Sequence, residues 1–327
     1  SERRGAAMAA DADECMSNVA DARVCTIAQV CAAAVDSAVS RHDDVHMSTS
    51  TDTSESTSSH DRDALARQAL DQFARDPGRS VAVCVEIGEL RWSAHVAGDV
   101  TRPAASLLKL PLAMAVESAM AADRHGLLPN ADVSVGSVLD GWSEPTVLRS
   151  LHPDRTVDAH EMLRLMISSS DGPSARWLLN AVGLPAVVTA VASSGCNATE
   201  VELRPGAAGG SLIGVTTAVD ALRMLAAACD QQRFPITAAA LAASTLNSRI
   251  PLGVLASDIE IAHKTGTLFS VAHDVALLTV PGGEVRIAFL SDAQHDTLVT
   301  GYDMGICTQS LLAAFGVGVT GTRSVDG

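Results

Sequence analysis

The order of strand-like and helix-like segments constrains the fold of this chain more than any other feature. Two segments near its start, 81–87 and 90–96, and three near its end, 259–267, 273–280 and 284–290, have the length and β-branched content of strands. The stretch between them carries apolar residues at helical spacing, interrupted by Gly and Pro. We therefore predict an α/β fold (an α+β sandwich), with one antiparallel sheet built from both chain ends, flanked by helices, and an all-helical subdomain inserted.

The predicted helices are separated by residues that end helices. The first, 64–75, stops before Pro77 and Gly78. It places four apolar side chains on one face: Leu65, Ala69, Leu70 and Phe73. The other helices are expected over 106–122, 158–169, 173–181, 185–194, 216–229 and 302–315.

The segment 41–62 differs in composition from the rest of the chain. It is rich in Ser, Thr and Asp and has no large aliphatic cluster, so it cannot bury enough apolar surface to offset the entropy of ordering. We therefore expect an N-terminal tail and linker over 1–60, one domain over 61–320 and a C-terminal tail over 321–327. The one candidate signal peptide, 23–40, follows acidic rather than basic residues, so we expect a cytoplasmic location, with the periplasm and secretion left open.

Composition and charge exclude several classes of protein. The chain has 23 Lys and Arg against 38 Asp and Glu, a net charge of -15 that repels nucleic-acid phosphates. No run of about 18 apolar residues is present, so we expect no membrane span. The seven cysteines have neither a Cys-x-x-Cys pair nor regular spacing, which indicates neither a zinc site nor a disulfide framework. We expect a monomer that acts on a small molecule without a metal or other cofactor.

The first candidate for catalysis is Ser106-Leu107-Leu108-Lys109, at the start of a predicted helix. A three-residue step on a helix places Ser106 and Lys109 on the same face. A serine hydroxyl is a weak nucleophile at neutral pH, and a partly desolvated amine beside it can accept its proton. Ser-x-x-Lys alone also fits a serine N-cap followed by a solvated lysine, so it needs support from other motifs.

Two further motifs follow along the chain. Ser170-Asp171-Gly172 separates two predicted helices and, taken alone, would be a turn or a cap. Lys264-Thr265-Gly266-Thr267 lies in a late predicted strand, where alternation sends Lys264 and Thr265 to opposite faces and Gly266 lets another group approach the backbone. A lysine on an inner strand face needs a partner, and a substrate carboxylate is one candidate.

These three motifs in this order are the signature of one enzyme superfamily. Over about 61–318 the chain resembles the serine β-lactamase and penicillin-binding protein superfamily, and within it the class A β-lactamase-like serine hydrolases. The resemblance implies that Ser106 is acylated, with Lys109 as a proton acceptor, and that Ser170 relays a proton to the leaving nitrogen. It also implies that Lys264 holds Ser170 and the substrate carboxylate electrostatically.

The resemblance extends to the contacts with the substrate. It places five residues in the substrate-binding set: Asp171, Gly172, Thr265, Gly266 and Thr267. Thr265 and Thr267 would line the carboxylate site. The backbone N–H groups of Ser106 and Thr267 would form the oxyanion hole. Trp142 lies in a segment whose counterpart in the family borders the cleft.

The chain departs from the family pattern at two places. Gly172 stands where the family usually has Asn, which removes an amide that would contact the substrate and Lys109. In the expected Ω-loop, Glu200 keeps the spacing of a Glu-x-x-Leu-Asn pattern and would activate the deacylating water, but Arg204 replaces the Asn. Ala198 replaces an arginine that usually closes this loop, so we expect the loop to be looser. Glu200 could instead be a solvated strand or loop acid.

We therefore predict a serine hydrolase that cleaves a β-lactam or a related amide through a Ser106 acyl-enzyme. Deacylation would be slow or atypical if Glu200 does not reach the site. The alternatives on the same scaffold are a D-alanyl-D-alanine peptidase, an esterase, or a relative that binds a ligand without turnover. Ser106→Ala separates the enzymes from the last of these, because it would abolish hydrolysis only in an enzyme.

Overall fold

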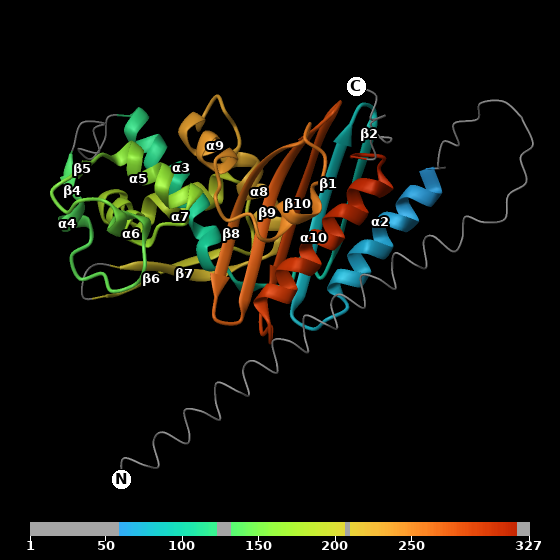
Figure 1. The fold of residues 1–327 in the computed structure, drawn as a ribbon, viewed down its shortest axis with the longest axis horizontal. Coiled ribbons are helices and arrows are strands. Elements are labelled where there is room, and N and C mark those ends of the chain that lie inside the picture. The colour runs from blue at the N-terminus through green and yellow to red at the C-terminus, as the bar shows by residue number, and fades with distance from the viewer. Residues whose placement is uncertain (1–58, 123–131, 207–209, 319–327) are drawn as a thin grey trace, which may run out of the picture. The chain divides into compact units, whose positions relative to one another are not determined.

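The computed structural model describes residues 59–122, 132–206 and 210–318. Helix α2 (Ser59–Ala74) begins inside the predicted linker, and the rest of the predicted tails lies outside the described residues. Helices and antiparallel strands are combined in one mixed α/β fold (Figure 1), as the sequence predicts.

Five strands form an antiparallel sheet in the order β2-β1-β10-β9-β8 (Figure 1). They are β1 (Arg79–Ile87), β2 (Leu90–Val96), β8 (Glu260–Leu268), β9 (Val271–Val280) and β10 (Gly283–Ser291). β1 pairs with β10 along its whole length, from Arg79 opposite Ser291 to Ile87 opposite Gly283. The two ends of the domain therefore meet inside the sheet, and the prediction of one sheet built from both chain ends is confirmed.

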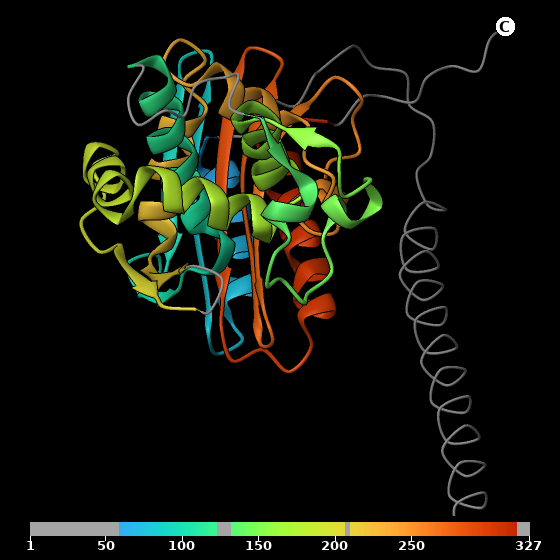
Figure 2. The same ribbon diagram turned by 90° about the vertical axis from the view of Figure 1, so that its left-hand side faces the viewer.

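Alternation along the strands divides the apolar side chains between two cores. In β1, the side chains of Val81, Val83 and Val85 belong to the core shared with α2 and the C-terminal helix α10 (Thr297–Ala314). Ala82, between them, belongs to the core shared with the helical subdomain. Figure 2 shows the sheet nearly edge-on between these two groups of helices. The sheet is thus covered by helices on both faces.

The buried face of α2 differs by one residue from the prediction. Its buried side chains are Ala66, Ala69, Leu70 and Phe73. These lie at the spacing i, i+3, i+4 and i+7 that a single apolar stripe requires. Leu65, predicted to lie on this face, is 49% exposed because it lies one residue outside the stripe.

The remaining helices form the inserted subdomain and the layer beneath the sheet. They are α3 (Lys109–Ala121), α4 (Val135–Val138), α5 (Ala159–Ser168), α6 (Gly172–Val182), α7 (Leu184–Ser193), α8 (Ala218–Ala228) and α9 (Pro235–Ala242), with the 3-10 turns η1 (Ala105–Leu108), η2 (Val147–Ser150) and η3 (Ile250–Gly253). Polar caps set several helix starts, such as the capping box of Asp158 and Glu161 before α5. The sequence does not predict α9, because its alanine-rich segment has no apolar stripe.

A helix that spans a membrane must be about 20 residues long and mostly apolar. No single one of the described helices is both long enough and apolar enough to cross a membrane. α6 and α7 meet these criteria of length and composition only as a pair, with a bend of 95° between them.

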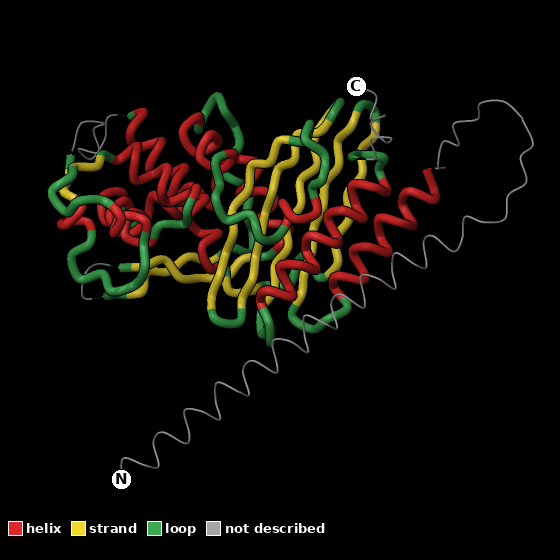
Figure 3. Tube along the Cα trace, in the orientation of Figure 1, coloured by secondary structure: helices red, strands yellow, loops and turns green. Residues whose placement is uncertain are grey.

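The inserted subdomain is not entirely helical. Two short strands, β4 (Val133–Ser134) and β5 (Thr156–Val157), pair with each other. A second sheet has the order β3-β7-β6 and consists of β3 (Arg102–Pro103), β6 (Glu200–Arg204) and β7 (Ser211–Thr216). Figure 3 shows the β6–β7 pair as a hairpin below the helices. Paired strands therefore occupy the segment in which the sequence analysis expects an Ω-loop.

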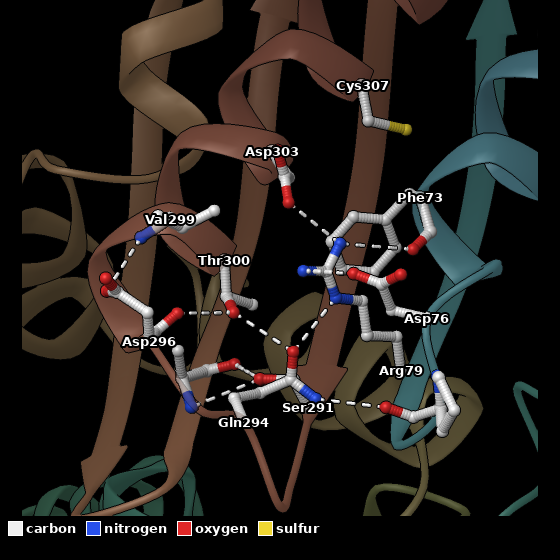
Figure 4. A network of polar contacts seen from close by, with 12 residues as sticks. Phe73, Asp76, Arg79, Ser291, Gln294, Asp296, Val299, Thr300, Asp303 and Cys307 are labelled. Atoms are coloured by element: carbon white, nitrogen blue, oxygen red, sulfur yellow. Dashed lines mark hydrogen bonds and ion pairs between the residues drawn. The ribbon is translucent and has the colours of Figure 1, made fainter. Parts of the chain in front are cut away.

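Arg79, at the start of β1, ties together the first and last helices of the domain (Figure 4). Its guanidinium group donates to the carbonyl oxygen of Phe73 in α2, pairs with Asp76, and binds Asp303 of α10 at 2.9 Å. Its Nε donates to Gln294, which precedes α10, at 3.0 Å. Because Arg79 is only 7% exposed, these contacts are made by a buried guanidinium group that holds α2 and α10 against the sheet.

Candidate active site

The three sequence motifs meet at the wall of one cavity of about 940 Å³. The cavity lies between the inserted subdomain, the β6–β7 hairpin and the end of β8. Its lining contains residues from every candidate segment: Ser106, Lys109, Ser170, Gly172, Glu200 and Thr267. The fold therefore brings together segments that are far apart in the sequence.

Ser106 lies in the 3-10 turn η1, and α3 begins only at Lys109, so the nucleophile candidate precedes the α-helix that the sequence predicts to start there. The preceding residue, Ala105, has a φ of 48°, a left-handed conformation that is rare for a residue with a Cβ. Such strain is typical of functional sites. A Cβ on Gly266 would lie only 3.3 Å from the Cβ of Ala105, so this glycine lets η1 approach β8, as predicted.

Both lysines of the sequence bind the same hydroxyl group. Lys109 and Lys264 are the two lysines of the whole chain. Their Nζ atoms lie 3.1 Å and 3.0 Å, respectively, from Ser170 Oγ, and Lys109 also donates to the Ser170 carbonyl oxygen. Two amine donors use both lone pairs of this hydroxyl, so its own hydrogen remains for donation to a group in the cavity.

The two lysines are unusual in their acidity. Burial lowers the pKa of Lys109 to about 8, and the charge of Asp171 opposes this shift only in part. Burial and then the charge of Lys109 hold the pKa of Lys264 well below its ordinary value. A large fraction of Lys109 is therefore an uncharged amine near pH 8, and an uncharged amine can accept a proton.

Three of the five residues predicted to bind substrate, Asp171, Thr265 and Gly266, do not line the cavity. Asp171 is buried and caps α6, because its carboxylate accepts from the backbone N–H and the hydroxyl of Ser174, at 3.0 Å and 2.6 Å, and from the Thr146 hydroxyl. A helix cap must turn its oxygens toward the helix N–H groups, away from a ligand. Thr265 is 4% exposed, whereas Thr267, nearer the end of β8, lines the cavity. Asp171 therefore has a structural role as a helix cap, and Thr267 rather than Thr265 is the threonine that a molecule in the cavity can reach.

Strand β6 presents charged side chains to the cavity. Glu200, Glu202 and Arg204 alternate along one face of the strand and all line the cavity, while Val201 packs against the core of the subdomain. Glu202 is therefore a second candidate for the base that activates the deacylating water, the role predicted for Glu200. The alternation of Glu200, Val201 and Glu202 in the sequence could have indicated that both carboxylates share one face. In the described part of the chain, no group of three or more His, Cys, Asp or Glu side chains is placed to hold a metal ion.

Asp220, near the start of α8, holds the base of the β6–β7 hairpin. Its carboxylate accepts from the backbone N–H groups of Asn197 and Ala198, at 3.1 Å and 2.8 Å, and from the Thr199 hydroxyl at 2.9 Å. Burial alone would raise the pKa of Asp220, but these hydrogen bonds and one from Arg223 hold it below its ordinary value. The base of the segment is thus fixed by hydrogen bonds to its backbone, although the sequence lacks the arginine expected at position 198.

Arg249, which the sequence motifs do not include, contacts the third motif. Its Nη2 donates to Thr267 Oγ1 at 2.6 Å, and its Nη1 donates to the carbonyl oxygen of Gly266 at 3.0 Å. It lies just before η3 and is 8% exposed. Arg249 therefore adds a fixed positive charge behind Thr267, and no local pattern in the sequence connects it with that position.

His273 joins the main sheet to the segment that carries Ser106. Its Nε2 lies 2.7 Å from the carbonyl oxygen of Pro103, and its Nδ1 accepts from the backbone N–H of Ser291 at 3.0 Å. These contacts require the neutral tautomer with its hydrogen on Nε2. Burial lowers the pKa of His273 to about 4, which keeps the ring in that neutral form. His273 thus helps to place the segment just before η1.

Comparisons with known proteins identify the family and the fold of the chain. The family that matches the sequence is the β-lactamase enzyme family, over residues 64–303. No curated protein sequence matches the chain. Among solved structures, a β-lactamase from Sphaerobacter thermophilus is 23% identical with a TM-score of 0.65, over 77% of this chain and 97% of that one.

Two further solved structures are similar to the same extent. A class A β-lactamase from Bacteroides cellulosilyticus is 19% identical with a TM-score of 0.64, over 78% of this chain and 98% of that one. The protein named PBP-A is also 19% identical with a TM-score of 0.64, over 77% of this chain and 96% of that one. At these identities the similarities establish the fold.

Proposed function

This chain belongs to the β-lactamase enzyme family, and from that premise we propose that it cleaves β-lactams or related amides through an acyl-enzyme on Ser106. One observation carries the proposal: both lysine amines bind Ser170 Oγ in a cavity that Ser106 also lines. Acyl transfer to serine needs a nucleophile, a base and a proton donor for the leaving group. Ser106, Lys109 and Ser170 are of the residue types that supply these three functions.

In the first step, Ser106 Oγ attacks the carbonyl carbon of the substrate. Lys109, in its uncharged form, accepts the proton of that hydroxyl, which its lowered pKa allows near neutral pH. The carbonyl oxygen becomes negatively charged as the tetrahedral intermediate forms. The backbone N–H groups of Ser106 and Thr267 would donate to this oxygen, and one such donor stabilises the transition state by about 3 kcal/mol.

In the second step, the bond between the carbonyl carbon and the amide nitrogen breaks. The Ser170 hydroxyl donates its hydrogen to the leaving nitrogen, and the Lys109 ammonium, 3.1 Å from Ser170 Oγ, returns a proton to Ser170. The proton taken from Ser106 thereby reaches the leaving group, and Lys109 becomes uncharged again. Lys264, which is buried, acts through Ser170, because its amine donates to Ser170 Oγ at 3.0 Å and holds that hydroxyl in place.

Substrates with a carboxylate would be held at the end of β8. Thr267 lines the cavity there, and Arg249 donates to its hydroxyl oxygen at 2.6 Å. The Thr267 hydroxyl hydrogen is then directed to an acceptor in the cavity, and the guanidinium charge attracts an anion. A penicillin or cephalosporin, which carries a carboxylate next to the lactam ring, fits this arrangement.

Deacylation would proceed as in class A β-lactamases, with Glu200 as the base that activates a water molecule. Glu200 lines the cavity, and its carboxylate can accept a proton from water as the water attacks the ester. Glu202 lies on the same face of β6 and is the alternative base. Because both are exposed side chains, we expect this step to be slower than acylation.

The test is to mix the protein with a penicillin and with a chromogenic cephalosporin, and to follow the intact mass and the colour together. We expect an adduct of the mass of the opened β-lactam, followed by its loss as colour develops. Ser106→Ala should abolish both signals. Colour that is unchanged in Ser106→Ala, or the absence of any adduct and of hydrolysis with β-lactams, amides and esters, would contradict the proposal.

A second function, acylation without efficient turnover, is favoured by one observation. The candidate deacylation bases lie on an edge strand of a separate small sheet, with Arg204 where the family pattern has Asn. A mutant of PBP-A, one of the structural neighbours, has been observed as an acyl-enzyme complex with penicillin G. A stable adduct that is lost in Ser106→Ala would assign this chain to that second function.

A further inference from the structure

We propose that Trp142 determines which acyl group this site accepts, and that the accepted group carries a hydrocarbon side chain, aromatic or aliphatic, in place of an acylamino one. The inference rests on the proposed function, because it concerns the acyl group that Ser106 receives. It starts from Gly172, the third residue of the second motif, whose neighbour in the cavity wall is the indole ring of Trp142.

The indole ring occupies the space that a side chain at position 172 would need. A Cβ built on Gly172 would lie 2.4 Å from Cζ2 and 2.6 Å from Cη2 of Trp142, distances that no real contact of this kind allows. Any residue other than glycine at position 172 therefore requires the ring to move. The absence of a side-chain amide at this position is thus matched by an aromatic ring that fills its volume.

Trp142 is held in place by contacts on several sides. Arg176 of α6 lies over the indole ring, with its guanidinium carbon 5.3 Å from the ring centre. The same guanidinium group donates to the carbonyl oxygens of Val138 and Asp140, at 2.7 Å and 2.8 Å, which fixes it against the Trp142 loop. Arg149 donates to the carbonyl oxygen of Trp142 itself. The ring is therefore a fixed part of the wall, and moving it would break a network.

The part of this wall next to Gly172 offers hydrocarbon to a ligand, whereas Ser143, Glu144 and Arg176 line the cavity around it. The indole Nε1 of Trp142 is buried and has no hydrogen-bond partner among the described residues, so its N–H group is not presented to the cavity. Ala175 and Leu179, which follow Gly172 on the same face of α6, also line the cavity. Along this face, a ligand meets the ring carbons of Trp142 and the side chains of Ala175 and Leu179.

This surface discriminates between acyl groups. The amide of an acylamino side chain placed against it would lose its hydrogen bonds to water without replacement, at a cost that slows reaction by about tenfold to a hundredfold. A hydrocarbon side chain of the same length loses nothing and gains contact with the ring. The site should therefore prefer carbon-chain acyl groups over their acylamino counterparts.

The preference can be measured with two esters that differ in a single amide. The para-nitrophenyl esters of γ-phenylbutyrate and of benzoylglycine have acyl groups of equal length, and the second has an amide where the first has two methylene groups. The quantity compared is the ratio of their kcat/KM values, after subtraction of the rate with Ser106→Ala. We expect the wild-type ratio to favour γ-phenylbutyrate by about tenfold or more.

Two variants test whether Trp142 causes the preference. Trp142→Ala should lower the ratio, and the double variant Trp142→Ala/Gly172→Asn, which places an amide in the vacated space, should lower it by about tenfold relative to the wild type. Trp177→Ala is the matched control, because Trp177 lies on α6, the helix that begins at Gly172, and packs against the core of the subdomain. Its ratio should equal that of the wild type.

The outcomes separate this inference from the proposed function. Ser106-dependent hydrolysis with the same ratio in the wild type and in Trp142→Ala overturns the inference and leaves the proposed function standing. No Ser106-dependent reaction with either ester or with any β-lactam overturns both. If the double variant does not fold, as judged by its thermal unfolding, the ratio for Trp142→Ala alone decides the matter.

Discussion

Two walls of the cavity differ in how firmly their reactive groups are held. On the wall formed by η1, the start of α6 and β8, Ser170 binds two lysine side chains that extend from different elements. On the opposite wall, Glu200 and Glu202 are exposed side chains of β6, which is an edge strand of a three-stranded sheet. The first wall carries the groups proposed for acylation, and the second carries those proposed for deacylation. The groups proposed for acylation are thus held by more contacts than those proposed for deacylation.

Removal of the amine of Lys109 from the first wall should have the largest effect on the rate of acylation. Lys109→Met should lower the rate of Ser106 acylation by about a thousandfold, because a positioned general base contributes about 10²- to 10⁴-fold. Arg204→Met is the matched control, since it removes a positive charge from the other wall of the same cavity. It should change acylation by less than about tenfold. The measurement is the rate of adduct formation by intact mass. Equal effects of the two variants would mean that Lys109 acts only through its charge.

The second wall is tested by its two neighbouring carboxylates. Glu200→Gln should slow deacylation by about a hundredfold and leave acylation unchanged, so that the adduct accumulates. Glu202→Gln should change deacylation by less than about tenfold, because it removes the same charge at the adjacent position of the same face. The measurement is the lifetime of the adduct after excess substrate is removed. If Glu202→Gln rather than Glu200→Gln prolongs the adduct, Glu202 is the base. If neither variant prolongs the adduct, the second wall has no part in deacylation.

The third test concerns the pH dependence of acylation on the first wall. Lys109 accepts a proton only when uncharged, so acylation should rise about tenfold per pH unit up to its pKa of about 8 and then level off. The chain has two lysines, so lysine-specific isotope labelling yields two side-chain NMR signals, which Lys109→Met assigns. The pH midpoint of the change in the Lys109 signal should equal the pH at which the acylation rate levels off. A rate that is constant from pH 6 to pH 9 would exclude Lys109 as the base.

Residues that act within one element were predictable from the sequence. The central strands have the alternation of a buried sheet, and the pairing of β1 with β10 follows from their positions near the two ends of the domain. Ser106 and Lys109 are three residues apart, and their place in the lining of the same cavity follows from that short spacing even though η1 ends and α3 begins between them. The order of the three motifs then identified the fold, because few folds place these residue types in such contexts.

Other parts of the site could not be predicted, because they depend on contacts between distant elements. Asp171 could bind a substrate or cap a helix, and only the position of Ser174 beside its carboxylate decides for the cap. The family pattern predicts an Ω-loop where the structure has the β6–β7 hairpin, and the alternation of Glu200, Val201 and Glu202 is the local signal for that strand. Arg249 has no motif around it, and its role follows only from its contact with Thr267.

Local patterns in the sequence were enough to predict the helices and strands of the central fold and the residues that are chemically able to act on a substrate. Both depend on short-range periodicity and on the chemistry of single side chains. The tertiary structure decided which of these residues share a cavity, how both lysines bind Ser170, and how the Trp142 ring fills the space beside Gly172. These features depend on packing between elements far apart in the chain, where a difference of one ångström separates a contact from a clash.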